Sequence, residues 1–197
     1  MLNGIDISHH DATRIRTGAL SITAPDFVIM KATEGFTYGD PLMWDYLKMI
    51  DQEKQGFGFY HYARPERNSA DIEAHNFLNR TVSFAGKALY ALDIEGKSFL
   101  LSNGALANWI LKWCQIVEKE TGVKPLVYTG TEGLMKFGRA ILSADIGLWF
   151  ARYRDKLDKE MYSPYPFWAI WQYSSNPHDQ DRFNGNRNQW NVYCAKR

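Results

Sequence analysis

The sequence predicts an α/β fold, a single domain built as an irregular TIM-like (β/α) barrel. Two observations lead to this prediction. Short apolar runs alternate along the chain with segments of helical periodicity, which is typical of strand–helix–strand units in a mainly parallel sheet. Polar side chains follow the carboxyl ends of these runs, where barrels of this kind carry their active residues. The later runs are less regular, so we expect an imperfect barrel.

The first half of the chain alternates strand and helix patterns. Apolar runs predict strands over residues 4–8, 26–32 and 56–62. Between the last two of these runs, Leu42, Tyr46 and Met49 share one face at helical spacing, which predicts a helix over residues 42–55. Another helix is expected to begin at Ser69, a residue type that favours the N-cap.

The second half repeats the pattern. Strands are predicted over residues 88–95, 125–129, 146–151 and 167–173, with a short helix near 132–137. A long amphipathic helix is predicted over residues 105–121, with Leu106, Ile110 and Trp113 facing the core, and Gly122 is expected to end it. No linker or internal repeat interrupts the chain, so residues 1–197 are interpreted as one domain.

Composition and charge exclude several classes of protein. The 197 residues are 45% hydrophobic and 23% charged, which suits a globular domain with a sizeable core. The net charge of +1 gives no reason to expect nucleic acid as a partner. No apolar run is long enough for a membrane span, and the first residues do not resemble a signal peptide. We expect a monomer in which Cys114 and Cys194 are buried thiols, with one disulfide as the alternative.

The apolar run at residues 88–92 ends in two carboxylates, Asp93 and Glu95. Residues i and i+2 of a strand point to the same face, with Cα atoms about 6.5–7 Å apart. Burying an unpaired charge is costly, and two adjacent carboxyls push their pKa values apart, so that one stays protonated near neutral pH. Such a pair can protonate a leaving group and stabilise positive charge, which is what glycoside hydrolysis requires.

Other polar and aromatic residues occupy the ends of separate predicted strands and should converge on the same mouth. The candidates for the site, apart from the carboxylate pair, are Asp6, Lys31, Glu34, Tyr60, Tyr62, Tyr128, Trp149, Trp171 and Gln172. The chain is 15% aromatic, and a surplus of Trp and Tyr suits the faces of sugar rings.

Several of these residues have a plainer interpretation. Lys31 and Glu34 could form an ordinary salt bridge at a strand end. Tyr60 and Tyr62 share one face of their strand and are assigned to the cleft, whereas His61 takes the other face and is interpreted as structural. Trp171 is assigned to the cleft as a sugar platform, with core packing as the alternative.

His9, His10 and Asp11 suggest a metal site at first sight. Adjacent histidines on a strand point apart, and no third ligand lies at a recognisable spacing. We therefore expect neither a metal ion nor another cofactor.

Short motifs occur in a fixed order along the chain. They are Gly4-Ile5-Asp6-Ile7-Ser8-His9, Lys31-Ala32-Thr33-Glu34-Gly35, Tyr60-His61-Tyr62-Ala63-Arg64-Pro65, Leu92-Asp93-Ile94-Glu95, Val127-Tyr128-Thr129, Trp171-Gln172-Tyr173-Ser174 and Asp179-Gln180-Asp181-Arg182-Phe183-Asn184-Gly185. In this order they resemble the motifs of family 25 glycoside hydrolases, the Chalaropsis-type lysozymes. The match extends from residue 4 to about residue 185, nearly the whole chain.

The resemblance implies an irregular α/β barrel that cleaves the β-1,4 bond from N-acetylmuramic acid to N-acetylglucosamine in bacterial cell-wall peptidoglycan. It implies Glu95 as the general acid and Asp93 as the group that orients the substrate's own acetamido group. Asp6 and Asp179 would complete the acidic cluster. Asp179 is chosen by counting back from Phe183, which leaves Asp181 at a secondary polar position, although an insertion or deletion before it would reverse that choice.

The chain departs from the family pattern in places. His10 and Asp11 stand where an aromatic residue and then Asn or Gln are more usual, and His178 replaces a small apolar residue before the last acid. These changes keep the acidic cluster and affect the expected fine specificity. Two other classes of function are weighed: a barrel that binds peptidoglycan or similar glycans without turnover, and a metal-dependent hydrolase such as a polysaccharide deacetylase.

Overall fold

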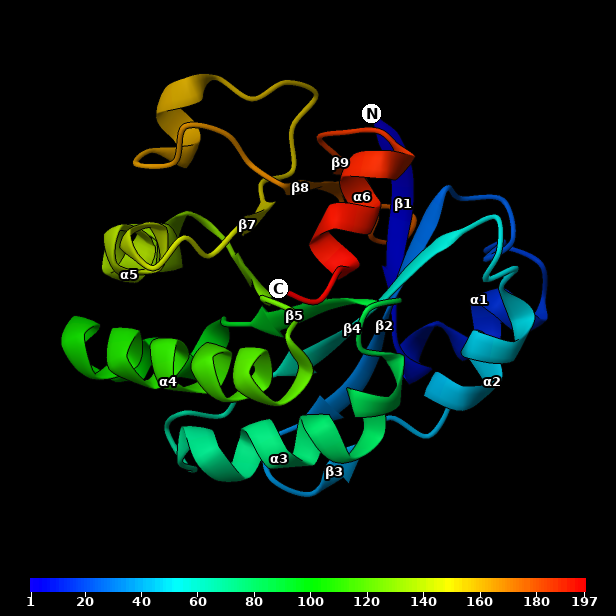
Figure 1. The fold of residues 1–197 in the computed structure, drawn as a ribbon. Helices are drawn as coiled ribbons and strands as arrows, with labels where there is room; N and C mark the ends of the chain where they lie inside the picture. The colour runs from blue at the N-terminus through cyan, green and yellow to red at the C-terminus, as the bar shows by residue number, and fades with distance from the viewer.

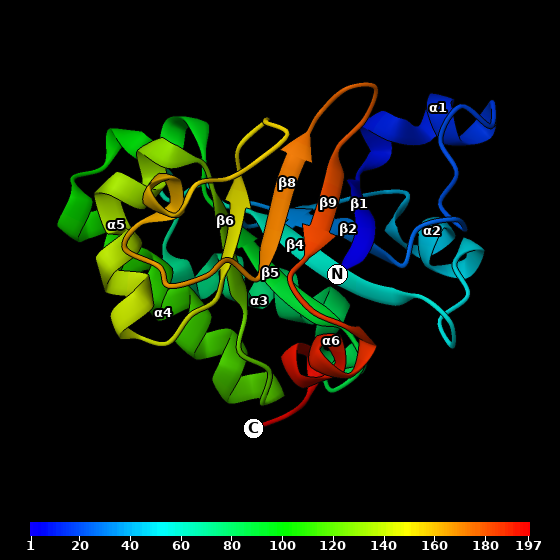
Figure 2. The same ribbon diagram turned by 90° about the horizontal axis from the view of Figure 1, so that it is seen from above.

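The computed structural model describes residues 1–197 and contains an eight-stranded barrel closed by pairing of its first and second strands. Going round the barrel the order is β1-β9-β8-β7-β6-β5-β4-β2, and the short β3 is attached to β2 (Figure 2). The strands are β1 (Leu2–Ile7), β2 (Phe27–Glu34), β3 (Tyr38–Gly39), β4 (Gly56–Tyr62), β5 (Leu89–Asp93), β6 (Leu126–Thr129), β7 (Leu148–Ala151), β8 (Ile170–Ser174) and β9 (Gln180–Phe183).

The helices lie outside the barrel, and α3, α4 and α5 follow one another along its surface (Figure 1). The α-helices are α1 (Ala12–Arg16), α2 (Met43–Met49), α3 (Ala70–Thr81), α4 (Asn103–Thr121), α5 (Thr131–Ser143) and α6 (Arg187–Cys194). The predicted irregular α/β barrel is thereby confirmed. None of the helices combines the length and apolarity needed to cross a membrane.

One barrel strand, β9, was missing from the sequence prediction. It runs antiparallel to both of its neighbours, β8 and β1, whereas the other barrel pairings are parallel. Its sequence Gln180-Asp181-Arg182-Phe183 contains no apolar run, because only four residues are needed to bridge β8 and β1. An antiparallel neighbour also needs no crossover helix, so the alternating pattern used for the prediction is absent here.

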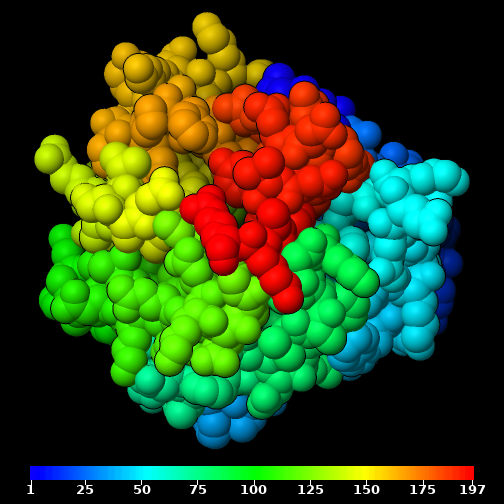
Figure 3. Space-filling view, viewed as in Figure 1, coloured from blue at the N-terminus to red at the C-terminus, as the bar shows by residue number.

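Strand alternation divides the apolar residues between two cores. The larger core lies between the sheet and the helices and includes Phe59, Phe77 and Trp113. The smaller core fills the barrel and includes Phe27 and Trp149. Trp190 of α6 belongs to this inner core, and α6 with the C-terminal residues covers the end of the barrel opposite the carboxyl ends of its parallel strands (Figures 2 and 3).

The observed element boundaries agree best with the predicted ones where the sequence has a strong local signal. The predicted strand 56–62 matches β4, and α4 ends at Gly122, which has a left-handed φ of 74° as its C-cap role requires. Ser69 lies at the N-cap of α3, as predicted, although its side chain makes no capping hydrogen bond. α5 is longer than predicted. Cys114 and Cys194 are buried free thiols.

A buried polar network joins the barrel to α3. Glu73 is inaccessible to solvent, and its Oε2 accepts bonds from His61 Nε2 at 2.8 Å and from the Arg64 backbone N–H at 3.0 Å. Asn68 Nδ2 donates to the other oxygen at 2.6 Å. Burial lowers the pKa of His61, which keeps the ring neutral and allows Nδ1 to accept from the Thr33 hydroxyl. His61 is therefore structural, as its strand face predicted.

Replacing Glu73 with Ala should destabilise the protein by about 2–5 kcal/mol, because buried donors lose their only acceptor. The free energy of unfolding from urea denaturation measures this loss. Glu120→Ala, at an exposed position of α4, serves as the control and should change stability by less than about 0.5 kcal/mol. A Glu73→Ala protein as stable as this control would contradict the assignment of the network as a stabilising element.

Candidate active site

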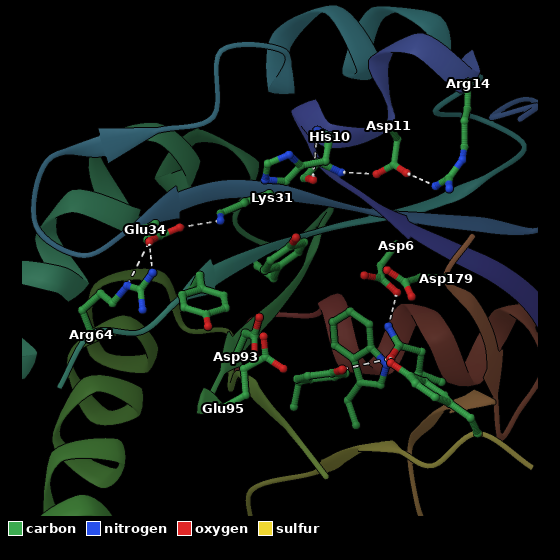
Figure 4. A pocket seen from close by; sticks show the side chains of 17 residues that line it. Asp6, His10, Asp11, Arg14, Lys31, Glu34, Arg64, Asp93, Glu95 and Asp179 are labelled. Atoms are coloured by element: carbon green, nitrogen blue, oxygen red, sulfur yellow. Dashed lines mark hydrogen bonds and ion pairs between the residues drawn. The ribbon is translucent and has the colours of Figure 1, made fainter. Parts of the chain in front are cut away.

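A cleft of about 510 Å³ opens at the carboxyl ends of the parallel strands (Figure 4). All the barrel strands that run parallel to one another contribute to it, so the convergence predicted from the sequence is present. Its lining consists of Asp6, Ser8, His10, Asp11, Arg14, Lys31, Glu34, Tyr60, Tyr62, Arg64, Asp93, Glu95, Tyr128, Trp149, Tyr153, Gln172 and Asp179.

The carboxylate pair lines the cleft, with Asp93 and Glu95 next to each other (Figure 4). Asp93 is the last residue of β5, and Glu95 keeps an extended backbone, with φ −154° and ψ −179°, just beyond it. Ile94 between them is fully buried in the outer core. The i, i+2 spacing therefore directs both carboxyls into the same cleft, as expected.

Burial dominates the electrostatics of this pair. Asp93 is only 7% exposed, and its Oδ1 has no hydrogen-bond partner. Burial raises the pKa of Asp93 well above its usual value, and the neighbouring Glu95 raises it further. Burial also raises the pKa of Glu95, an effect that the nearby Tyr62 hydroxyl opposes. The pair is thus arranged to retain a proton that an isolated carboxyl would have lost.

One wall of the cleft carries two cations that share one carboxylate. Glu34 accepts a bond from Lys31 Nζ at 2.6 Å and another from Arg64 Nη2 at 2.6 Å. Both cations also lie against the Tyr62 ring, 4.8 and 4.7 Å from its centroid. Lys31 and Glu34 therefore form a salt bridge and line the cleft at once, so the two interpretations are compatible.

The opposite wall is acidic and is organised by Gln172. Gln172 Nε2 donates to Asp6 Oδ2 at 2.7 Å, while its Oε1 accepts from the hydroxyls of Tyr128 at 2.9 Å and Tyr153 at 3.2 Å. Asp179 also lines this wall, and burial raises its pKa to about 6. The amide of Gln172 thus fixes Asp6 relative to two tyrosines.

The two C-terminal acids occupy different places. Asp179 lines the cleft, whereas Asp181 is inaccessible to solvent and is not part of the lining. Asp181 Oδ1 accepts a bond from Trp149 Nε1 at 2.8 Å. The geometry therefore separates two residues that share a strand face in the sequence.

The assignment of Trp171 to the cleft is wrong. Trp171 precedes Gln172 on β8, and neighbouring residues of a strand face opposite sides, so only one of the two can point into the cleft. Gln172 does so, and Trp171 instead donates its Nε1–H to the Arg152 carbonyl and packs against Trp168 and Tyr173. The other predicted site residues all line the cleft.

Several lining residues were not predicted as part of the site. Arg64 and Tyr153 are two of them. Tyr153 continues the alternation of Trp149 and Ala151 beyond the end of β7, a signal that could have revealed it. Arg14 comes from α1, and only the folding of that helix over the mouth brings it there. No group of three or more His, Cys, Asp or Glu side chains is arranged to hold a metal ion.

The chain is similar to known proteins in both sequence and fold. The sequence pattern of glycosyl hydrolases family 25 matches residues 5–182. The chain is 28% identical to the uncharacterized protein YegX of Escherichia coli strain K12, a match covering 93% of this chain and 70% of YegX. It is 29% identical to the lysozyme of Streptococcus phage Cp-1, covering 90% of this chain and 52% of that lysozyme.

The fold is similar to the structure of a muramidase from Trichobolus zukalii, with a TM-score of 0.83 and 28% identity, covering 98% of this chain and 99% of that one. The resemblance seen in the order of the sequence motifs is thereby confirmed. Since the family pattern covers nearly the whole chain and the barrel carries its motifs to one cleft, the chain belongs to glycosyl hydrolases family 25.

Proposed function

We propose that residues 1–197 act as one catalytic domain, an N-acetylmuramidase that cleaves the β-1,4 bond between N-acetylmuramic acid and N-acetylglucosamine in bacterial peptidoglycan. The observation that supports the proposal most strongly is the Asp93–Glu95 pair in an open cleft, with Asp93 buried and Glu95 half-buried. Membership of a glycosyl hydrolase family and likeness to a muramidase and a phage lysozyme support it.

Glu95 is the proposed general acid. It is less buried than Asp93, and it lines both the main cleft and an adjoining hollow of about 400 Å³. Tyr128 and Tyr153 line both spaces as well. A polymer could therefore lie across Glu95 with sugars on either side, which places a glycosidic oxygen within reach of the acid.

Asp93 is proposed to act on the substrate's acetamido group. Its unpaired, buried Oδ1 can accept the acetamido N–H, which directs the acetamido carbonyl oxygen toward the anomeric carbon. Asp6 and Asp179 would stabilise the positive charge that develops on the sugar ring. No cofactor takes part in this scheme.

The remaining lining residues are proposed to bind the glycan. Tyr60, Tyr62, Tyr128 and Trp149 offer aromatic surface, and Lys31, Glu34 and Gln172 offer hydrogen-bonding groups. The partner is the bacterial cell wall, on which we propose the protein acts as a monomer after secretion or cell lysis.

The direct test is the clearing of a suspension of purified bacterial walls, followed by mass analysis of the released fragments. New reducing ends on muramic acid identify the proposed bond. Binding without clearing would favour a glycan-binding barrel, and clearing that a chelator abolishes would favour a metal-dependent hydrolase.

Glu95→Gln should keep the shape of the side chain and remove its transferable proton. The rate of wall clearing should fall by at least about 10²–10⁴-fold, because general acid catalysis contributes a factor of that size. An unchanged thermal melt shows that the fold is retained, and Glu132→Gln, exposed on α5, is the matched control. Near-normal clearing by folded Glu95→Gln would refute the assignment.

Tyr62→Phe should move the alkaline limb of the pH–rate profile to higher pH. The acid acts only while protonated, and the Tyr62 hydroxyl lowers the pKa of Glu95, so its removal lets that pKa rise. The profile of kcat/KM against pH measures the change. Tyr173→Phe is the control, because its hydroxyl bonds Gln180 outside the cleft lining. A limb that moves to lower pH in Tyr62→Phe would contradict this account.

Acetamido participation predicts tight inhibition by a thiazoline analogue of the cyclised acetamido group and no covalent glycosyl-enzyme. Peptide mass analysis after incubation with a slow fluorinated substrate provides the second measurement. An ester trapped on Asp93 would show that Asp93 is the nucleophile instead.

A further inference from the structure

The buried carboxyl of Asp181 has no role in the scheme above. Asp181 lies in β9 opposite Gly4 of β1 and opposite Gln172 of β8, so it sits where the antiparallel strand closes the barrel. It is fully inaccessible to solvent. A carboxylate in such a place is expected only if its oxygens are well bonded.

Only one of its oxygens has an ordinary donor. Oδ1 accepts from Trp149 Nε1 at 2.8 Å, whereas Oδ2 is buried without any N–H or O–H partner. The second side chain in hydrogen-bonding contact with Asp181 is that of Asp6, whose carboxyl already accepts a bond from Gln172 Nε2 at 2.7 Å. Two ionised carboxylates have no hydrogen between them, so this contact is favourable only if a proton is present.

We propose that Asp6 and Asp181 form an acid–carboxylate pair that shares one proton, and that Asp181 is a positioning residue for Asp6. The shared hydrogen bond and the Gln172 amide would hold the Asp6 carboxyl from two sides while its remaining surface faces the cleft. The importance of this positioning for turnover rests on the proposed function, whereas the existence of the pair does not.

The groups around the pair provide no positive charge that would stabilise two ionised carboxylates. Asp179 precedes β9 and adds negative charge, and the hydroxyls of Tyr60, Tyr128 and Tyr153 face the same region from β4, β6 and the segment after β7. Trp149 and Gln172 offer neutral donors. Burial raises the pKa of Asp181 to about 7 and raises that of Asp6 as well, consistent with one retained proton.

The pH dependence follows from these directions. An unfolded aspartate has a pKa of about 3.9, so the folded pair binds a proton that the unfolded chain releases. The pair therefore favours the folded state most at low pH, and this contribution falls as pH rises from about 4 to about 7. Above that range the pair carries two charges and loses its shared hydrogen bond.

Carbon-13 NMR of protein labelled at aspartate carboxyls tests the pair directly. The Asp6 and Asp181 signals, assigned with the Asp6→Asn and Asp181→Asn variants, should titrate together in the wild type, well above the range of an ordinary aspartate. Asp145, exposed after α5, is the internal control, because the neighbouring Lys124 lowers the pKa of its carboxyl and its signal should therefore stay at the ionised position over this pH range. Two signals at the ionised position throughout pH 5–8 would overturn the proposal.

Turnover of two variants tests the positioning role. The amide of Asp181→Asn can donate an N–H to Asp6 at any pH, because this donor does not depend on a titratable proton. The variant should therefore clear walls at pH 6 and lose less activity than the wild type between pH 6 and pH 8. Asp181→Leu offers no donor and should lower kcat by at least about tenfold. Thermal melts verify that both variants are folded.

Equal losses of kcat in the two folded variants would show that Asp181 only fills space and would overturn its positioning role. Wall clearing by neither the wild type nor any variant would instead refute the proposed function, while the NMR titration would still decide whether the proton is shared.

Discussion

Closure of the sheet by β9 is the constraint on which the site depends. This four-residue strand pairs antiparallel with β8 on one side and β1 on the other. It brings Asp6, from the beginning of the chain, next to Gln172 and Asp181, from its end. Without this pairing the barrel would be an open sheet, and its acidic wall would not face the Asp93–Glu95 pair.

The cleft at the mouth of the closed barrel is lined by more carboxyl groups than cations. The carboxyl groups of Asp6, Asp93, Glu95 and Asp179 all line it. Two of its cations, Lys31 and Arg64, are already ion-paired with Glu34. Burial in such a place raises carboxyl pKa values, and the raised values reduce the repulsion because fewer groups ionise. A cleft of this kind costs stability and is typical of a functional site rather than of a stabilising one.

Hydrogen bonds on the outer side of the sheet compensate for this loss of stability. His61 faces away from the cleft between Tyr60 and Tyr62, and its bonds to Thr33 and Glu73 tie β4 to β2 and α3. The Tyr62 ring is in turn in contact with two cations, Lys31 and Arg64. β4 therefore presents Tyr60 and Tyr62 to the cleft on one side and the hydrogen-bonded His61 to a buried polar network on the other.

The sequence by itself determined the features that repeat along the chain. The alternation of apolar runs with helical segments predicted the barrel. The spacing of Asp93 and Glu95 predicted that they share one face, and the order of the motifs indicated the family. The alternation of side chains along a strand could also have excluded Trp171 from the cleft, because Trp171 and Gln172 are adjacent and cannot both point inward. The tertiary structure alone decided which neighbours meet across the barrel. Asp179 and Asp181 share a strand face, yet one lines the cleft and the other is buried against Asp6. The family motif favoured Asp179 for the cleft, but the local sequence did not reveal the contact of Asp181 with Asp6, because burial, and the protons that burial retains, depend on residues far apart in the chain.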